Sequence, residues 1–148
     1  LGMPDLRDMG IVAIGAALGG VLRFVVAGAV TSLFVRGAAE AANAPGATLL
    51  GAMPWGTLVV NVTGCLVIGT LLPLLPGVDD PRGAWRLLIV VGILGGYTTL
   101  SAFALETYRL IRADQIGAAV LYMLLTNSGA MIAITLGVLL GRAIVRGG

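Results

Sequence analysis

The sequence predicts an all-α integral membrane protein, a single domain over residues 1–148 with four transmembrane helices. Apolar residues make up 58% of the chain and charged residues only 11%, whereas roughly a quarter of the residues in a soluble protein are charged. The mean hydropathy of +1.03 is correspondingly high. Four long intervals are almost free of charge, and each reaches the length of about 20 residues that a helix needs to cross a bilayer.

The positions of charge, proline and glycine define the four spans in order. The first interval contains one charge, Arg23, the second contains none, and the fourth is uncharged as far as Arg142. Connecting segments at 36–54 and 76–81 gather proline, glycine and acidic residues, which are typical of turns and loops. The predicted spans are about 10–35, 55–75, 85–111 and 115–144.

The link between the third and fourth spans is short. Arg109, Arg112 and Asp114 mark it, so we expect these two spans to form a tight antiparallel hairpin.

The arginines near the span ends are distributed almost evenly between the two faces of the membrane. A strong excess of arginine and lysine on one side orients a membrane protein, and a weak excess permits insertion both ways. Two opposed copies of this chain can therefore pair as an antiparallel dual-topology dimer. The face that holds both termini carries Arg7, Arg82, Arg86, Arg142 and Arg146, against Arg36, Arg109 and Arg112 on the other face.

Composition also excludes several classes of function. The nine basic residues are all arginine and are scattered, so no basic tract is available to bind nucleic acid. Cys65 is the single cysteine and histidine is absent, which excludes a disulfide framework within one chain and argues against a metalloenzyme site. Residues 1–9 are not a basic leader, so we expect the first span to be retained.

Two polar side chains in the first and second spans are candidates for an ion path. Arg23 is costly at mid-helix, about 2.5 to 3.5 kcal/mol on insertion scales, unless it meets protein or water. It either pairs helices or supplies a positive potential that attracts anions. Asn61 lies in mid-bilayer with Thr57 one turn earlier on the same face. Its amide either bonds another helix or offers N–H donors to a dehydrated anion.

The third span contains a segment that disfavours a continuous helix. Paired glycines at Gly95 and Gly96 precede β-branched and hydroxylated residues, and hydroxyl groups can bond backbone groups that a break releases. We therefore expect an unwound turn near Gly95 to Ser101. Broken helices at membrane depth commonly mark ion sites, because carbonyl groups and half-helix ends become available there.

Polar residues return after the expected break and along one face of the fourth span. Glu106 follows the break, close enough to the helix end to reach interfacial water. Tyr122, Thr126 and Ala130 recur every four residues on one face of the fourth span. Such a thin stripe is either a helix contact or the wall of a conduit.

Together these segments resemble the Fluc (also called CrcB) family of fluoride channels over essentially the whole chain. Gly19-Gly20-Val21-Leu22-Arg23-Phe24 resembles the family's first-helix motif, and the segment 56–64 around Asn61 resembles its second-helix signature. The segment 95–103, Gly-Gly-Tyr-Thr-Thr-Leu-Ser-Ala-Phe, is similar to the family's third-helix break.

The resemblance implies an antiparallel homodimer with two pores in a bacterial inner membrane. It also implies a structural Na⁺ at the dimer centre, held here by the main-chain carbonyls of Gly95 and Thr98. Fluoride would pass the electropositive edge of Phe103. At the first ring position Leu100 replaces the usual Phe, and at another motif position Ala102 replaces Thr. The expected pore residues are Arg23, Thr57, Asn61, Leu100, Ser101, Phe103, Glu106, Tyr122 and Thr126.

Of three other classes of function, the sequence favours only the first. A non-conducting or heterodimer-dependent subunit of the same family is the main alternative, because Leu100 and Ala102 depart from the pore motif. A small multidrug antiporter needs a carboxylate in its first span, where this chain has Arg23 instead. An intramembrane enzyme needs a nucleophile and base, and Glu106 is isolated.

Overall fold

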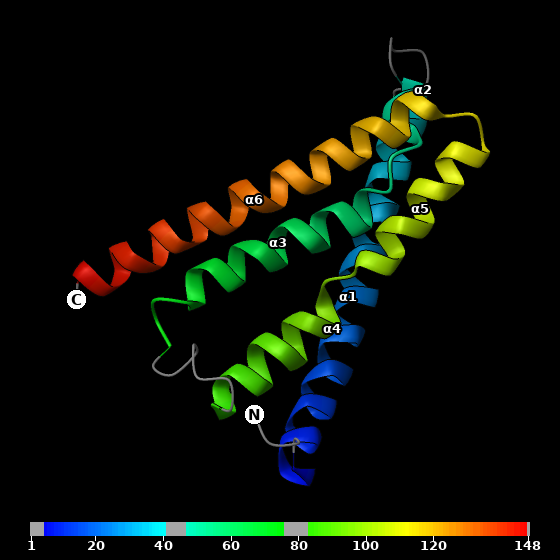
Figure 1. Cartoon of the computed structure of the whole chain (residues 1–148). Coiled ribbons are helices and arrows are strands. Elements are labelled where there is room, and N and C mark those ends of the chain that lie inside the picture. Colours follow the sequence, from blue (N-terminus) through cyan, green and yellow to red (C-terminus); the bar gives the residue numbers. More distant parts are fainter. Residues whose placement is uncertain (1–4, 41–46, 76–82, 148) are drawn as a thin grey trace.

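The computed structural model describes residues 5–40, 47–75 and 83–147, which form helices joined by short connections (Figure 1). The third predicted span is divided into three consecutive helical segments, the first of which is π-helical. The elements are α1 (Leu6–Glu40), α2 (Ala47–Gly51), α3 (Trp55–Leu71), η1 (Arg86–Leu94), α4 (Gly95–Tyr97), α5 (Leu100–Arg112) and α6 (Ile116–Gly147).

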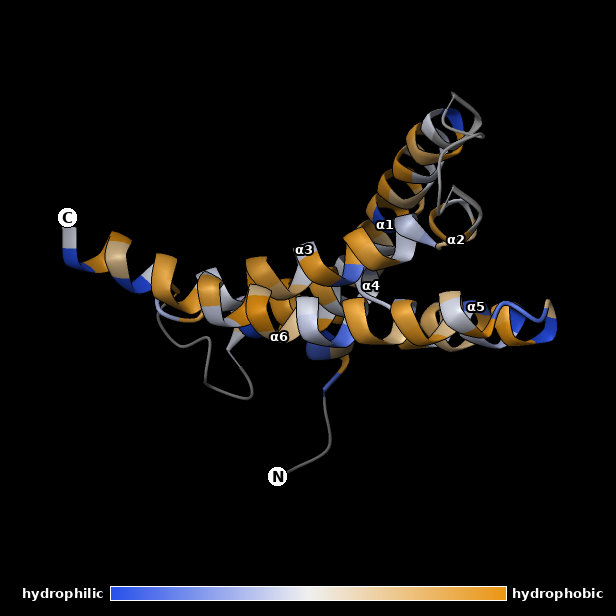
Figure 2. Cartoon of the chain, turned by 90° about the horizontal axis from the view of Figure 1, so that it is seen from above, coloured by the Kyte–Doolittle hydropathy of each residue, from blue (hydrophilic) through white to orange (hydrophobic). Residues whose placement is uncertain are grey.

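Three stretches of helix are long and apolar enough to cross a membrane. They are Leu6–Gly37, Arg86–Arg112 and Ile116–Gly147, and at most 17% of the most apolar window in each is buried inside the molecule. Figure 2 shows apolar residues along the helices and hydrophilic ones at the end of α6 and near the α5–α6 connection. These features are those of a multi-pass membrane protein, whose apolar outer surface faces lipid.

The second predicted span is shorter than the others. α3 is an apolar helix of 17 residues, which corresponds to about 25 Å against a hydrocarbon core of about 30 Å. The total of four spans therefore stays a prediction. The expected connection at 76–81 lies outside the described residues.

Glycines bring the helices together in two pairs. α3 lies along α6, and η1 with α4 lies along α1 (Figure 1). A Cβ atom at Gly137 of α6 would collide with the Leu66 carbonyl of α3, and one at Gly15 of α1 would lie 2.6 Å from the Leu88 carbonyl of η1. Backbones approach this closely only where side chains are absent, and van der Waals contact then replaces the missing hydrophobic driving force.

The third span is broken, but the break covers fewer residues than the sequence predicted. Only Thr98 (φ −79°, ψ 155°) and Thr99 (φ −152°, ψ 117°) are extended. The prediction that the chain unwinds from Gly95 to Ser101 is wrong at both ends, since Gly95–Tyr97 and Leu100–Ser101 are helical. Gly96 serves packing, because a Cβ there would lie 2.5 Å from the Ala16 carbonyl. Glycine predicts a break in the helix, whereas Gly96 instead permits the close approach of α4 to α1.

A three-residue connection, 113–115, joins α5 to α6. Asp114 has a φ of 57°, a left-handed conformation that aspartate tolerates better than most residues. α5 and α6 contact each other near this connection, where Leu110 packs with Ala118 and Ala119. Beyond it they diverge, and α6 continues along α3 (Figure 1). The divergence leaves room between α3, α5 and α6 for the site described next.

Candidate functional site

Glu106 of α5 is the centre of a hydrogen-bond network that joins three helices. The Thr57 hydroxyl of α3 donates to Glu106 Oε1 over 2.8 Å, and the Tyr122 hydroxyl of α6 donates to Glu106 Oε2 over 2.7 Å. Thr57 is 7% exposed and Tyr122 is fully buried. Each carboxylate oxygen therefore has a donor in place of water, which offsets the cost of holding it inside the molecule. The sequence had indicated a carboxyl group near interfacial water.

Asn61 of α3 binds the extended backbone at the break in both directions. Its Nδ2 donates to the Thr99 carbonyl over 3.1 Å, and its Oδ1 accepts the Thr99 N–H over 2.8 Å. These bonds satisfy the Thr99 N–H, which the break removes from the helix, and give the Thr99 carbonyl a donor from α3. One N–H of the amide remains for another acceptor.

The break leaves the carbonyls of Gly95 and Thr98 without their helical donors. In a continuous helix the Gly95 carbonyl would accept from the N–H of Thr99, and the Thr98 carbonyl from that of Ala102. The Thr99 N–H instead bonds Asn61, and the Ala102 N–H donates to the Thr99 hydroxyl over 3.1 Å. These are the two carbonyls that the sequence analysis expected to bind Na⁺.

Thr99 also begins α5, a role that the sequence analysis did not assign. Its side chain is the N-cap of the helix, and its hydroxyl lies 3.2 Å from the Ser101 hydroxyl. Threonine directly before a helical run is a common capping residue, and this signal was available in the sequence. Ser101 therefore supports the cap, and its side chain is exposed.

Phe103 packs against Tyr122, with ring centroids 5.2 Å apart and planes tilted by 42°. In a tilted pair, the electropositive edge of one ring points toward the groups beside the pair. The side chain of Leu100, one turn earlier on α5, is 77% exposed. The chain therefore presents one aromatic ring and one exposed aliphatic side chain at the two expected ring positions.

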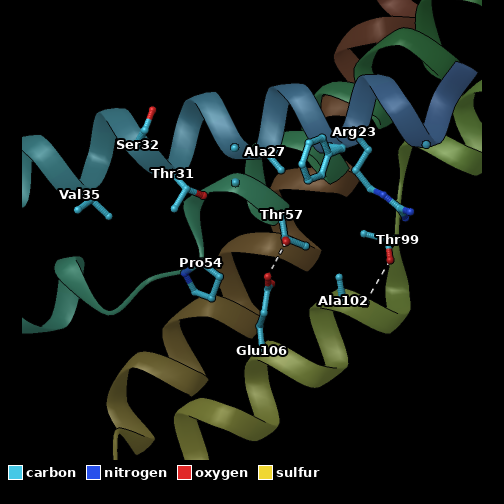
Figure 3. Close-up of a pocket in the computed structure, with 14 residues that line it drawn as sticks. Arg23, Ala27, Thr31, Ser32, Val35, Pro54, Thr57, Thr99, Ala102 and Glu106 are labelled. Carbon is cyan, nitrogen blue, oxygen red and sulfur yellow. Dashed lines mark hydrogen bonds between the residues drawn. The ribbon is translucent and has the colours of Figure 1, made fainter.

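A cavity of about 620 Å³ lies between α1, α3 and α5, and we call it the Arg23 cavity (Figure 3). Figure 3 shows Arg23 on α1 together with Thr57, Thr99 and Glu106 around it. The Arg23 guanidinium and the Glu106 carboxyl group therefore line the same cavity. Its wall also includes Gly20, Ala27, Thr31, Ser32, Pro54 and Ala102.

A second cavity, of about 260 Å³, lies between α3, α6 and the break, and we call it the Asn61 cavity. Thr126 of α6 lines it and is 7% exposed, yet its hydroxyl has no hydrogen-bond partner among the described residues. A buried polar group without a partner is uncommon and indicates a ligand, ion or water. The cavity is lined by Asn61, Cys65, Ile68, Thr98, Thr99, Leu100, Phe103, Thr126, Asn127 and Ala130.

The expected pore residues thus divide between the two cavities. Arg23, Thr57 and Glu106 line the Arg23 cavity, and Asn61, Leu100, Phe103 and Thr126 line the Asn61 cavity. Tyr122 links the two sets, since it bonds Glu106 and packs on Phe103. Ser101 is found in neither lining set. Sequence reasoning missed Cys65 as a lining residue, although it follows Asn61 by four positions and so shares its helix face.

Across the described ranges, no three His, Cys, Asp or Glu side chains come together in a way that could hold a metal ion.

Comparison with known proteins identifies the family of this chain. The family described as CrcB-like protein, Camphor Resistance (CrcB), matches residues 10–138. A protein of Erythrobacter litoralis named fluoride-specific ion channel FluC is 39% identical over 144 residues, which is 95% of this chain and 96% of the relative. Proteins of the same name from Acidobacterium capsulatum and Novosphingobium aromaticivorans are each 38% identical, over 90% and 92% of this chain and 95% and 94% of their own lengths. The chain belongs to the CrcB-like protein family.

Proposed function

We propose that this chain is a fluoride-specific ion channel and not an enzyme. The observation that carries the proposal is its 39% identity, over 95% of its length, to a protein named as a fluoride-specific ion channel. The helical architecture supports it, since three helices are long and apolar enough to cross a membrane. The named relatives are bacterial proteins, so we assign the chain to a bacterial inner membrane.

The proposed path uses the free donors of the two cavities. Arg23 supplies a positive potential in the Arg23 cavity, where fluoride enters. Thr57 and Tyr122 donate to Glu106, so they shape the carboxylate and do not themselves solvate the ion. In the Asn61 cavity, the remaining N–H of Asn61 and the unpartnered hydroxyl of Thr126 replace part of the lost hydration shell. The ring edge of Phe103 faces the ion between them.

A structural Na⁺ is compatible with the geometry of the break. Alkali and alkaline-earth cations prefer oxygen ligands, and half-helix ends in membrane proteins supply them as free carbonyls. Gly95 and Thr98 carry the two carbonyls whose helical donors are diverted to Asn61 and Thr99. When bound, the ion would neutralise the partial negative charge of these groups, and an antiparallel copy of the chain would contribute the same two carbonyls.

The second candidate is a subunit that conducts only with a different partner. Leu100 favours it, because this side chain is 77% exposed at the Asn61 cavity and offers no electropositive ring edge. In an antiparallel homodimer both pores would carry this aliphatic group. A partner chain with phenylalanine at this position would supply the missing ring.

Fluoride efflux from liposomes that contain only the purified chain tests the proposal. We expect rapid efflux on a fluoride electrode, with chloride retained, and a loss of at least tenfold in Asn61→Ala and Phe103→Ala. Val67→Ala, a change on the exposed side of α3, is the matched control. Absence of efflux from a folded wild-type dimer would exclude a self-sufficient homodimeric channel. Normal efflux in folded Asn61→Ala and Phe103→Ala dimers would show that the path lies elsewhere.

A further inference from the structure

The hydrogen-bond donors that line the Asn61 cavity are mostly committed to the protein itself. The Thr98 hydroxyl donates to the Leu94 carbonyl over 2.9 Å. The Thr99 hydroxyl pairs with Ser101 and accepts the Ala102 N–H. An anion in this cavity therefore meets fewer donors than the number of polar side chains suggests.

Two hydroxyl or thiol donors on the cavity wall have no partner among the described residues. One is the Thr126 hydroxyl on α6. The other is the free thiol of Cys65 on α3, which makes no hydrogen bond within the described part of the chain. Both residues line the same cavity. The unpartnered and buried Thr126 hydroxyl independently indicates that the space next to Cys65 holds a polar ligand.

The position of Cys65 continues the line of donors along α3. It follows Asn61 by four residues, so both side chains project from one face of the helix, about 6 Å apart along its axis. Ile68 continues this face and is apolar, and Ala130 lines the cavity from α6 without a donor. Beyond Asn61 and Thr126, two side chains on this wall keep a free polar hydrogen: Cys65, and the exposed Asn127, whose amide donates one N–H to the Met123 carbonyl and retains the other.

We propose that the Cys65 thiol is an anion-contacting group of the fluoride path, placed one helical turn beyond Asn61. The inference rests on the proposed function of the Asn61 cavity. A thiol is a weak donor, so it assists the ion between stronger donors. A group attached to its sulfur would project into the same cavity and obstruct the path.

Three variants separate the effect of the Cys65 donor on efflux from the effect of its side-chain volume. Cys65→Ala removes the donor, and we expect fluoride efflux to fall about threefold to tenfold, the range for one modest hydrogen bond. Cys65→Ser restores a donor of smaller volume and should conduct at least as fast as the wild type. Ala130→Ser added to Cys65→Ala supplies a hydroxyl from α6 and should recover most of the flux. Val67→Ala, a change at an exposed position of α3 two residues away, should leave efflux unchanged.

The single cysteine also permits chemical modification at one known atom. The Cys65 thiolate attacks the sulfenyl sulfur of methyl methanethiosulfonate, forms a mixed disulfide that carries a methylthio group, and releases methanesulfinate, while the thiol proton passes to buffer. Mass spectrometry measures the modified fraction. We expect efflux to fall at least fivefold in proportion to that fraction, reducing agent to restore it, and Cys65→Ser to be insensitive.

The outcomes distinguish this inference from the proposed function. If the wild-type chain passes no fluoride, the function assigned to the Asn61 cavity fails. If the wild type conducts but folded Cys65→Ala conducts equally well, the cavity assignment stands and the role of Cys65 is excluded. Unchanged efflux after complete modification, or no modification at all, also excludes it.

Discussion

At the residue scale, hydroxyl groups in this chain have two distinct roles that only their partners reveal. Thr57 and Tyr122 donate to Glu106 and hold three helices around one carboxylate. A hydrogen bond to a charged group contributes about 1.5 to 3 kcal/mol, so these residues stabilise the fold. Thr126 has no such partner. Its hydroxyl does little for stability and is available to an ion.

Thr126→Val tests this separation of stability from transport. Valine has nearly the shape of threonine, and replacing an unpartnered buried hydroxyl with a methyl group removes a polar group that has no bond to lose. We expect the midpoint of thermal unfolding in detergent to stay equal or rise, while fluoride efflux falls about tenfold, as for the loss of one good donor.

Thr135→Val is the matched control for this prediction. Thr135 lies on the exposed side of the same helix and donates to the Met131 carbonyl of its own turn. Efflux should be unaffected there. A large loss of stability in Thr126→Val with normal efflux would mean that its hydroxyl has a structural partner and no contact with fluoride.

At the element scale, the break in the third span and the tight helix pairs depend on each other. Gly96 lets α4 approach α1, where a Cβ would lie 2.5 Å from the Ala16 carbonyl. Asn61 then satisfies the released backbone of Thr99 from α3. The two extended residues are therefore held between helices on both sides, which keeps an irregular backbone stable at membrane depth.

Gly137→Ala tests the close packing of α3 on α6. A Cβ at this position would collide with the Leu66 carbonyl, which belongs to rigid backbone, so the helices must separate. We expect a loss of about 1 to 3 kcal/mol, the usual cost of overpacking, seen as a lower unfolding midpoint in detergent. Because α3 and α6 both line the Asn61 cavity, fluoride efflux should change as well.

Gly10→Ala provides the comparison for a glycine without neighbours. No atom lies within 4 Å of a Cβ at Gly10 in α1. Alanine favours helix over glycine by about 1 kcal/mol, so this variant should be as stable as the wild type or slightly more stable. Equal destabilisation of both variants would contradict the packing argument.

At the scale of the whole molecule, the site is open on one side. Leu100 at the start of α5 is 77% exposed, and Gly95 is also exposed near the break. The proposed second copy would cover this surface and complete the path. The ring pair and the cation site are thus properties of the proposed dimer, to which each chain contributes Phe103, Leu100 and two carbonyls.

Leu100→Phe tests whether an aromatic ring at this exposed position supports fluoride efflux. The side chain is exposed, so phenylalanine fits without a clash inside one chain, and it supplies an electropositive ring edge at the Asn61 cavity. We expect the variant to form the same oligomer by size-exclusion chromatography and to pass fluoride as fast as the wild type or faster. Complete loss of efflux in a folded dimer would mean that the path is built around leucine.

The sequence by itself determined the membrane character, the long apolar helices and the presence of a break in the third span, because these depend on local quantities: hydropathy, charge-free length and side-chain type. It also indicated Asn61, Phe103 and Thr126 as polar or aromatic groups in apolar spans. It could not show which donors are free, since Asn61 and Thr57 are committed to partners 38 and 49 residues away.

Only the tertiary structure decided the extent of the break and the division of the site into two cavities. Glycine disfavours helix locally, but Gly96 remains helical because close packing against Ala16 of α1 outweighs propensity. Cys65 likewise lines the Asn61 cavity because α6 and the break lie beside its face of α3. Contacts between distant segments determine these features, and no local pattern in the sequence encodes them.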